Sequence, residues 1–313
     1  MNLAAIPHYT SLANALVSLF GTSVKIARTD RVSGGDINKA YALTLTTGDR
    51  IFMKANAKEN AAFFTAEAAG LSAIAETGTI GTPRILCTGT DDGEEVGYSF
   101  LLLEYIESGK KRNDYFETFA RELAAMHDSD TKSFLIQADS ETDGKNRFGF
   151  FQDNFIGARP QENTPNDSWI SFFRDRRLIP QFKAADRYFS DSDRRQNTKL
   201  LDNLEKILSE PEKPSLLHGD LWGGNVLADK DGKAILIDPA AYVGHAEADL
   251  AMTELFGGFP PAFYDAYKEA HKMQAGYEDR RDLYNLYHLL NHLNMFGESY
   301  LNPVQSIVAE YVG

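Results

Sequence analysis

The sequence predicts an α+β protein built from two lobes. An antiparallel sheet with one long helix occupies residues 1–106, and a mainly helical lobe occupies residues 107–313. Period-two alternation of apolar residues marks the first part, whereas apolar residues three or four apart mark the part beyond about residue 114. A length of 313 residues also suits about two domains. A ligand cleft between two such lobes is the expected arrangement.

The first lobe should begin with a helix, because Leu12, Leu16 and Leu19 share one face and Gly21 can end it. Thr47-Gly48-Asp49 has the composition of a hairpin turn between two strands. The long helix is expected over 59–76, which is rich in Ala and Glu. The strands of this lobe are predicted at 24–29, 41–46, 51–55, 84–88 and 98–105.

The second lobe should contain helices around residues 116–126, after Ser168, over 201–208 and over 283–293, where leucine and phenylalanine recur at helical spacing. A short hairpin interrupts this pattern, with strands at 226–228 and 234–237. Residues 137–167 are polar and rich in Asn, Asp and Gly, so we expect a long loop there.

Composition excludes several classes of function. The chain has 32 Lys and Arg against 45 Asp and Glu, a formal charge of −13, so it has no overall attraction for nucleic acid or an anionic membrane. Its single cysteine, Cys87, cannot form an internal disulfide. No apolar run reaches the ~20 residues of a membrane span, and the first 24 residues lack the features of a signal peptide. We therefore expect a cytoplasmic protein.

The stretch from His218 to Asn225, His-Gly-Asp-Leu-Trp-Gly-Gly-Asn, carries the strongest functional signal together with Asp238, which follows the hairpin. The spacing of Asp220, Asn225 and Asp238 is typical of phosphoryl transfer in the protein-kinase-like fold. Asp220 would accept the proton of an attacking hydroxyl, while Asn225 and Asp238 would bind Mg²⁺. Taken singly, Asp220 or Asn225 would more often cap a turn than take part in catalysis.

The first lobe contains residues that this pattern requires. Lys54 interrupts an apolar strand and Glu67 lies in the following helix, so an ion pair between them could hold the phosphates of ATP. The alternative is a solvated lysine on an edge strand and an exposed helix residue. Gly34 and Gly35 would belong to a loop over the phosphates, or to a simple tight turn. Backbone groups of Glu104 and Ile106, where the last strand ends, would contact adenine.

These residues resemble the aminoglycoside phosphotransferase and choline kinase branch of that fold, and more specifically the fructosamine kinase (ketosamine 3-kinase) family. The matching segments are Asp220–Asn225, Asp238–Ala240, Asp153–Gly157, Trp169–Arg177 and Phe256–Phe259. The resemblance implies an ATP- and Mg²⁺-dependent kinase that phosphorylates the 3-hydroxyl of a ketosamine. The phosphorylated adduct then eliminates and frees the amine, which is deglycation.

The resemblance also assigns roles to residues around the motif. It implies that Asp249 is a buried aspartate that braces the catalytic loop, and His218 is expected to hold the loop backbone. Many relatives have a cysteine in the phosphate loop, but this chain has Asp36 after the two glycines, so no redox switch is expected there. Trp222 could form an apolar wall for the substrate, and His245 could contact it; core packing is the alternative for both.

Two further patterns have plain interpretations. Arg174, Arg176 and Arg177 form a basic cluster that could contact phosphate, but a solvated helix face is favoured. His288 and His292 are four residues apart, as metal ligands can be, but ordinary packing is favoured.

The alternatives to a ketosamine kinase are an aminoglycoside or other small-alcohol phosphotransferase of the same fold, and a non-catalytic nucleotide-binding module. Trp222 and the segment 153–177 argue against the first, and the complete set of motif residues argues against the second. The sequence leaves open which ketosamine sugar is used, whether the amine belongs to a free amino acid or to a protein, and the oligomeric state.

Overall fold

The structure is a computed structural model that describes residues 6–33, 37–93, 97–135 and 147–313. Its contacts divide the chain into two units. The first unit comprises residues 1–115 together with 226–239, and the second comprises 116–225 together with 240–313. The mixed α/β content, with an antiparallel-rich sheet early in the chain and helices later, confirms the predicted fold class. None of the described helices is long and apolar enough to cross a lipid bilayer.

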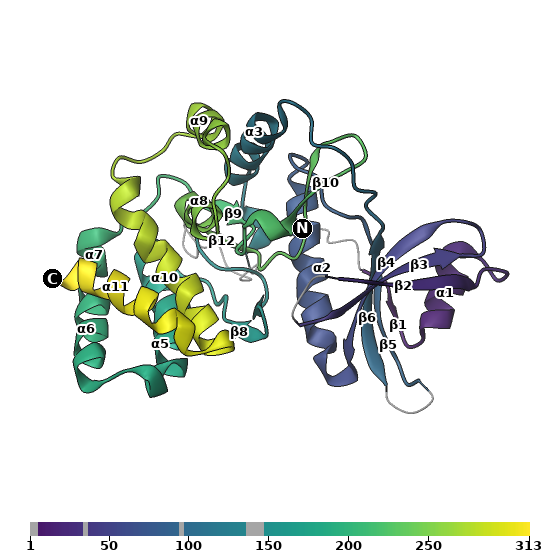
Figure 1. Ribbon diagram of the computed structural model, residues 1–313, viewed down its shortest axis with the longest axis horizontal. Helices are drawn as coiled ribbons and strands as arrows, with labels where there is room; N and C mark the ends of the chain where they lie inside the picture. Colours follow the sequence, from purple (N-terminus) through teal and green to yellow (C-terminus); the bar gives the residue numbers. More distant parts are fainter. Residues whose placement is uncertain (1–5, 34–36, 94–96, 136–146) are drawn as a thin grey trace. The chain divides into compact units, whose positions relative to one another are not determined.

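The first unit is built on a six-stranded sheet (Figure 1). In spatial order its strands are β1 (His8–Tyr9), β5 (Ile85–Asp91), β6 (Tyr98–Glu104), β4 (Arg50–Ala57), β3 (Lys39–Leu45) and β2 (Ile26–Val32). Every neighbouring pair is antiparallel except β1 and β5. The predicted strands and the turn at Thr47-Gly48-Asp49 are therefore confirmed, while β1, of two residues, was too short to be found from the sequence.

Two helices cover opposite faces of this sheet (Figure 1). Phe100 and Leu102 of β6 pack in the cluster with α1 (Leu12–Phe20), whereas Leu101 and Leu103 pack against α2 (Ala61–Glu76). Successive strand residues point to opposite faces of the sheet, and both faces are covered by a helix. This explains why β6 carries apolar side chains on both faces. Gly21 ends α1 at φ 100°, as the sequence predicts, and Ser11 caps its start.

The hairpin of β10 (Val226–Ala228) and β11 (Ala234–Leu236) belongs to the first unit, although it lies late in the sequence. Ile235 forms a parallel bridge with Gly81, and the N–H group of Leu236 donates to the carbonyl of Gly81 at 2.9 Å. The hydroxyl of Tyr115 donates to the carbonyl of Leu227. These bonds fix the segment that leads into Asp238.

The second unit is mainly helical. Its principal helices are α3 (Tyr115–His127), α4 (Trp169–Phe173), α5 (Ile179–Ala184), α6 (Asp191–Asp202), α7 (Leu204–Ile207), α8 (Ala246–Leu255), α9 (Pro261–Ala270), α10 (Tyr277–Phe296) and α11 (Leu301–Val312). Two short antiparallel ladders accompany them: β9 (Ser215–Leu217) with β12 (Tyr242–Gly244), and β7 (Asn154–Ile156) with β8 (Arg159–Gln161).

Three predictions for this unit need correction. The helix expected over 201–208 is two helices that break at Asn203, where the backbone φ is −112°. The loop expected over 137–167 contains the β7–β8 hairpin in its described part. Arg177 is not on a solvated face. It is fully buried in a π-helical turn, where its guanidinium donates to the carbonyl of Glu162 and to Oδ1 of Asn163, both at 2.7 Å.

Candidate active site

Lys54 lies in the middle of β4 on the face of the sheet that α2 covers. Its Nζ donates to Oε1 of Glu67 at 2.7 Å, so the ion pair expected between strand and helix is present. Both side chains are about nine-tenths buried, with 9% and 11% exposed. The alternative of a solvated lysine is therefore wrong, because β4 is an interior strand between β3 and β6 and turns this position toward α2.

Asp238 supplies a second carboxylate to Lys54. It follows β11, and its Oδ1 lies 2.6 Å from Nζ of Lys54. Its side chain is 39% exposed, so part of the carboxylate can face a ligand. Within the described residues, Asp238 is the one non-glycine residue with a positive φ, 57°. Such a backbone is uncommon for any residue but glycine, and it turns the chain sharply at the end of the hairpin.

The electrostatics keep Lys54 charged. Burial by itself lowers the pKa of Lys54, but the carboxylates of Asp238 and Glu67 outweigh it and raise the pKa above the ordinary value. Burial raises the pKa of Glu67, and the attraction of Lys54 offsets only part of that rise. The result is a buried ammonium held at a defined place by two acids from distant parts of the sequence.

The segment 218–225 forms a tight loop in the second unit. The side-chain Nδ2 of Asn225 donates to the backbone carbonyl of Asp220 at 2.8 Å and to its Oδ2 at 3.1 Å. A short 3₁₀ turn over Gly223–Asn225 brings the amide back, with the N–H of Asn225 donating to the carbonyl of Trp222. Asn225 thus orients the Asp220 carboxylate, while its own Oδ1 makes no hydrogen bond with the described residues.

Neighbouring atoms lie close to two glycines of this loop. Gly219 has φ 80°, and a Cβ there would lie 2.2 Å from the carbonyl oxygen of Ala240. At Gly224 a Cβ would lie 2.4 Å from the Trp222 ring. Because Gly224 has no side chain, the indole of Trp222 can pack against the loop, yet Trp222 remains 40% exposed.

The carboxylate of Asp249 accepts hydrogen bonds from the backbone at the start of the loop. Its Oδ2 accepts the N–H of His218 at 2.6 Å and its Oδ1 accepts the N–H of Gly219 at 2.8 Å. Burial alone raises the pKa of Asp249. The hydrogen bond and charge of His127, the charge of His218 and the hydrogen bond from the Gly219 N–H outweigh burial and lower the pKa overall. The N–H of Asp220 in turn donates to Nδ1 of His218 at 3.3 Å.

Two residues behind Asp249 escaped the sequence analysis. Nε2 of His127 lies 3.3 Å from Oδ2 of Asp249, and the hydroxyl of Tyr267 lies 2.6 Å from Nδ1 of His127. Both side chains are completely buried. A histidine at the end of one helix and a tyrosine in another carry no local pattern that links them.

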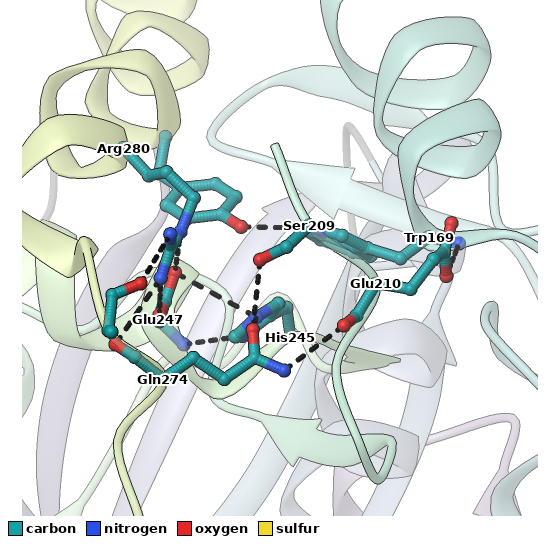
Figure 2. A network of polar contacts seen from close by, with 9 residues as sticks. Trp169, Ser209, Glu210, His245, Glu247, Gln274 and Arg280 are labelled. Carbon is teal, nitrogen blue, oxygen red and sulfur yellow. Dashed lines mark hydrogen bonds and ion pairs between the residues drawn. The ribbon is translucent and has the colours of Figure 1, made fainter. Parts of the chain in front are cut away.

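His245 lies in a buried polar network, shown in Figure 2. Its Nδ1 accepts the N–H of Glu247 and caps α8, and its Nε2 lies 3.3 Å from Oε1 of Gln274. Glu247 binds Arg280 through two hydrogen bonds of 2.6 and 2.8 Å. Burial lowers the pKa of His245. These contacts favour a helix-capping role over the expected substrate contact.

The position of His245 supports the same interpretation. It lines a cavity of about 340 Å³ together with Ser215, Glu247, His271 and Gln274. Strand β9 begins at Ser215 and ends at Leu217, and the loop 218–225 follows it. His245 and the cavity therefore lie at the other end of this short ladder from Asp220.

The predicted adenine contacts, Glu104 and Ile106, lie at and just beyond the end of β6. β6 ends at Glu104, whose N–H donates to the carbonyl of Arg84 and whose side chain is exposed. Ile106 lies two residues beyond the strand. Gly34, Gly35 and Asp36 fall outside the described residues.

The Lys54–Glu67 pair of the first unit and the Asp220–Asn225 loop of the second have the residue pattern of phosphotransferases of the kinase-like fold. Comparison with known proteins identifies the family. A profile of the fructosamine kinase family matches residues 8–313. A probable ketoamine kinase from Synechocystis sp. is 37% identical over 96% of both chains, and a chloroplastic protein-ribulosamine 3-kinase from Arabidopsis thaliana is 38% identical over 93% of this chain and 85% of its own length.

Solved structures agree. A crystal structure of a Haemophilus somnus protein assigned as a fructosamine-3-kinase has a TM-score of 0.81 at 29% identity and covers 97% of each chain. A macrolide 2′-phosphotransferase, with a TM-score of 0.55 at 15% identity over 96% of each chain, shares the fold. The chain belongs to the fructosamine kinase family. It is accordingly a kinase that transfers a phosphoryl group to a hydroxyl group of a ketosamine.

Proposed function

We propose that this chain uses ATP and Mg²⁺ to phosphorylate the 3-hydroxyl of ketosamines, with Asp220 as the general base. The observation that carries the proposal is the arrangement of Lys54 between Glu67 and Asp238, 2.7 and 2.6 Å from their carboxylate oxygens. A buried ammonium fixed by two acids is suited to hold phosphate oxygens, because phosphoryl transfer depends on positioning and on charge neutralisation.

Lys54 would bind the ATP phosphates and Glu67 would hold its ammonium in place. The backbone of Gly34 and Gly35 would cover the phosphates, and backbone groups at Glu104 and Ile106 would bind adenine. These assignments follow the kinase pattern.

The donor set fits Mg²⁺. Asn225 offers a neutral amide oxygen and Asp238 a partly exposed carboxylate, and Mg²⁺ is commonly bound by one or two protein oxygens together with phosphates and water. In the described part of the chain no group of three His, Cys, Asp or Glu could form a closed metal cage. When bound, Mg²⁺ would neutralise charge on the transferred phosphoryl group.

In the transfer step the carboxylate of Asp220 takes the proton of the sugar 3-hydroxyl. The hydroxyl oxygen forms a bond to the γ-phosphorus as the bond to the ADP oxygen breaks, and ADP leaves. Asn225 orients the carboxylate through its Nδ2, and Asp249 fixes the loop through its two backbone bonds. Trp222, exposed two residues after the base, would form an apolar wall beside the sugar.

The product, a ketosamine 3-phosphate, would eliminate phosphate and release the amine, so the reaction would remove sugar from amino groups. A cytoplasmic location remains a prediction from the sequence.

The decisive experiment replaces Asp220 by Asn. The D220N variant should bind ATP with affinity close to that of the wild type, while ADP release with ribulose-lysine falls by about 1000-fold. Asp231→Asn, at an exposed position in the turn of the β10–β11 hairpin, is the matched control and should retain activity. Full turnover by D220N would show that another residue is the base.

A further inference from the structure

Three side-chain amides form a hydrogen-bonded cluster in the second unit. We call Asn154, Gln161 and Asn163 the amide cluster. Oδ1 of Asn154 accepts a hydrogen bond from Nε2 of Gln161 at 2.7 Å and another from Nδ2 of Asn163 at 2.9 Å. All three side chains are buried. The β7–β8 hairpin supplies the first two, and its antiparallel register places Asn154 directly opposite Gln161.

The cluster holds the backbone carbonyls of two residues that precede β12. Nε2 of Gln161 donates to the carbonyl of Ala240 at 3.1 Å, and Nδ2 of Asn154 donates to the carbonyl of Ala241 at 2.8 Å. Both alanines are buried and lie outside the β9–β12 ladder, so their carbonyls need partners other than strand neighbours. The two amides supply these partners and fix the backbone of 240–241.

Ala240 in turn contacts the start of the loop 218–225. Its N–H donates to the carbonyl of His218 at 2.9 Å. Its carbonyl oxygen lies so close to Gly219 that a Cβ there would be 2.2 Å away. The next residue in the chain is Asp220. The backbone that the amides hold is therefore the surface on which the loop packs just before the general base.

The far side of the cluster is equally well anchored. Oε1 of Gln161 accepts the hydroxyl of Tyr287 at 2.5 Å, and Oδ1 of Asn163 accepts Nη2 of Arg177 at 2.7 Å. Each side-chain oxygen and nitrogen of the cluster thus makes at least one hydrogen bond. Burial raises the pKa of Tyr287, and the negative charge of Asp220 adds to that rise, so Tyr287 lies within electrostatic range of the base. A buried network with every member satisfied is rigid.

We propose that Gln161 and Asn154 are positioning residues for the general base. They hold the backbone of 240–241, on which residues 218–219 rest, and so they fix the place of the Asp220 carboxylate without touching it. The inference rests on the proposed function, because it needs Asp220 to be the base. A base that is displaced by a fraction of an ångström transfers the proton more slowly, although both substrates still bind.

The loop has two independent supports. Asp249, on α8, accepts the N–H groups of His218 and Gly219, whereas Ala240 donates to the carbonyl of His218. Loss of the amide support leaves the bonds to Asp249 in place. We therefore expect a folded enzyme with a looser loop and a lower kcat.

Gln161→Met tests this role, because methionine has nearly the same length and donates no hydrogen bond. In this variant kcat for ADP release with ribulose-lysine should fall by about tenfold, while the KM values for ATP and ribulose-lysine stay within about twofold of the wild type. Tyr287→Phe leaves both Nε2 bonds of Gln161 intact, and it should lower kcat by only about threefold. It applies the same test if Gln161→Met does not fold.

Gln274→Met is the matched control. It removes a half-buried amide that contacts Ser209 and the carbonyl of Glu210, at the other end of the β9–β12 ladder from Asp220. The same substitution there should lower stability but leave kcat as in the wild type. The comparison separates positioning of the base from a general loss of stability.

Tryptophan fluorescence reports on the loop without turnover. The chain has two tryptophans: Trp169 is completely buried, whereas Trp222 lies in the loop and is 40% exposed. Acrylamide should therefore quench mainly Trp222. Gln161→Met should raise the quenching constant by about 1.5-fold because the loop opens more often, and Gln274→Met should leave it unchanged.

The proposal is overturned if Gln161→Met keeps kcat within about twofold of the wild type, or if Gln274→Met loses as much. A fall in kcat with unchanged quenching would also overturn it, because Gln161 would then act by a route other than the loop. If the wild type releases no ADP with ribulose-lysine while Gln161→Met still raises the quenching, the proposed function fails and the contact between cluster and loop stands.

Discussion

Nζ of Lys54 lies 2.6 Å from Oδ1 of Asp238, a residue 184 positions further along the chain. The contact exists because the β10–β11 hairpin belongs to the same unit as the six-stranded sheet. Its bridge to Gly81 anchors the hairpin, and the positive φ of Asp238 turns the carboxylate at its end. Lys54 and Asp238, to which we assign the binding of phosphate and of Mg²⁺, are thereby held in one unit.

Replacing Lys54 by Met should abolish turnover while leaving a folded protein. We expect ADP release with ribulose-lysine to fall by at least about 100-fold, because no cation remains to hold the phosphates. The free energy of unfolding should fall by about 1 to 3 kcal/mol, since Glu67 loses its partner while buried. Lys58→Met is the control: Lys58 is exposed and pairs with exposed Asp92, so this variant should keep both activity and stability. Activity in K54M close to that of the wild type would contradict the assigned role.

Removal of the amide at position 225 should appear as a changed metal requirement. Asn225→Ala should raise the Mg²⁺ concentration for half-maximal activity by about tenfold or more, because it removes one of the two protein oxygen ligands that we propose. Chelation with EDTA should stop the wild-type reaction, and added Mg²⁺ should restore it. Asn302→Ala, at an exposed position, should titrate like the wild type. An unchanged Mg²⁺ titration in N225A would show that Asn225 only orients Asp220.

Asp249 should matter for catalysis through the backbone alone. An Asn side chain at 249 has one acceptor oxygen, so Asp249→Asn leaves the N–H of His218 or of Gly219 unsatisfied in a buried place. We expect a loss of about 1 to 3 kcal/mol in the free energy of unfolding and a fall of at least about tenfold in kcat, with little change in KM for ATP. Tyr267→Phe, which lies behind His127 and so two contacts further from the loop, should show the same pattern more weakly. A rise in KM for ATP with kcat unchanged would contradict this role.

Much of the site could be predicted from the sequence because its parts are local. Lys54 is a charged residue in an apolar strand, Glu67 lies in the next helix, and Asp220 and Asn225 lie within one short loop. These residues can therefore be recognised within short stretches of sequence. The alternation of side chains along a strand also indicates which face of the sheet carries Lys54.

The parts that escaped prediction depend on contacts between distant segments. Arg177 is buried because Glu162, Asn163 and the face of Tyr242 accept it, with the Tyr242 ring centroid 4.0 Å away. His127 and Tyr267 meet across 140 residues. Helix periodicity predicts a solvated face for Arg177, and it says nothing about the contact between His127 and Tyr267. Only tertiary packing creates these partners.

His288 predicts how stability depends on pH. It is buried in α10 with no hydrogen-bond partner for its Nδ1 among the described residues. Burial lowers its pKa to about 3, with the charge of His292 acting in the same direction. The folded state therefore holds the ring neutral while the unfolded chain binds a proton below an ordinary pKa of 6.5. This contribution to stability is complete above pH 6.5 and is lost as the pH falls toward 3, at about 1.4 kcal/mol per pH unit.

His288→Leu removes this proton uptake and keeps an apolar side chain in the same space. Between pH 7 and pH 5 the free energy of unfolding of the wild type should fall by roughly 2 kcal/mol more than that of the variant. Urea unfolding at several pH values measures the difference, whatever the stability of the variant at pH 7. Replacement of exposed His8 by Leu should leave the pH dependence as it is in the wild type, which separates the buried histidine from a general effect of removing one. Parallel pH curves for the wild type and H288L would mean that His288 is protonated in the folded protein, or reaches water there.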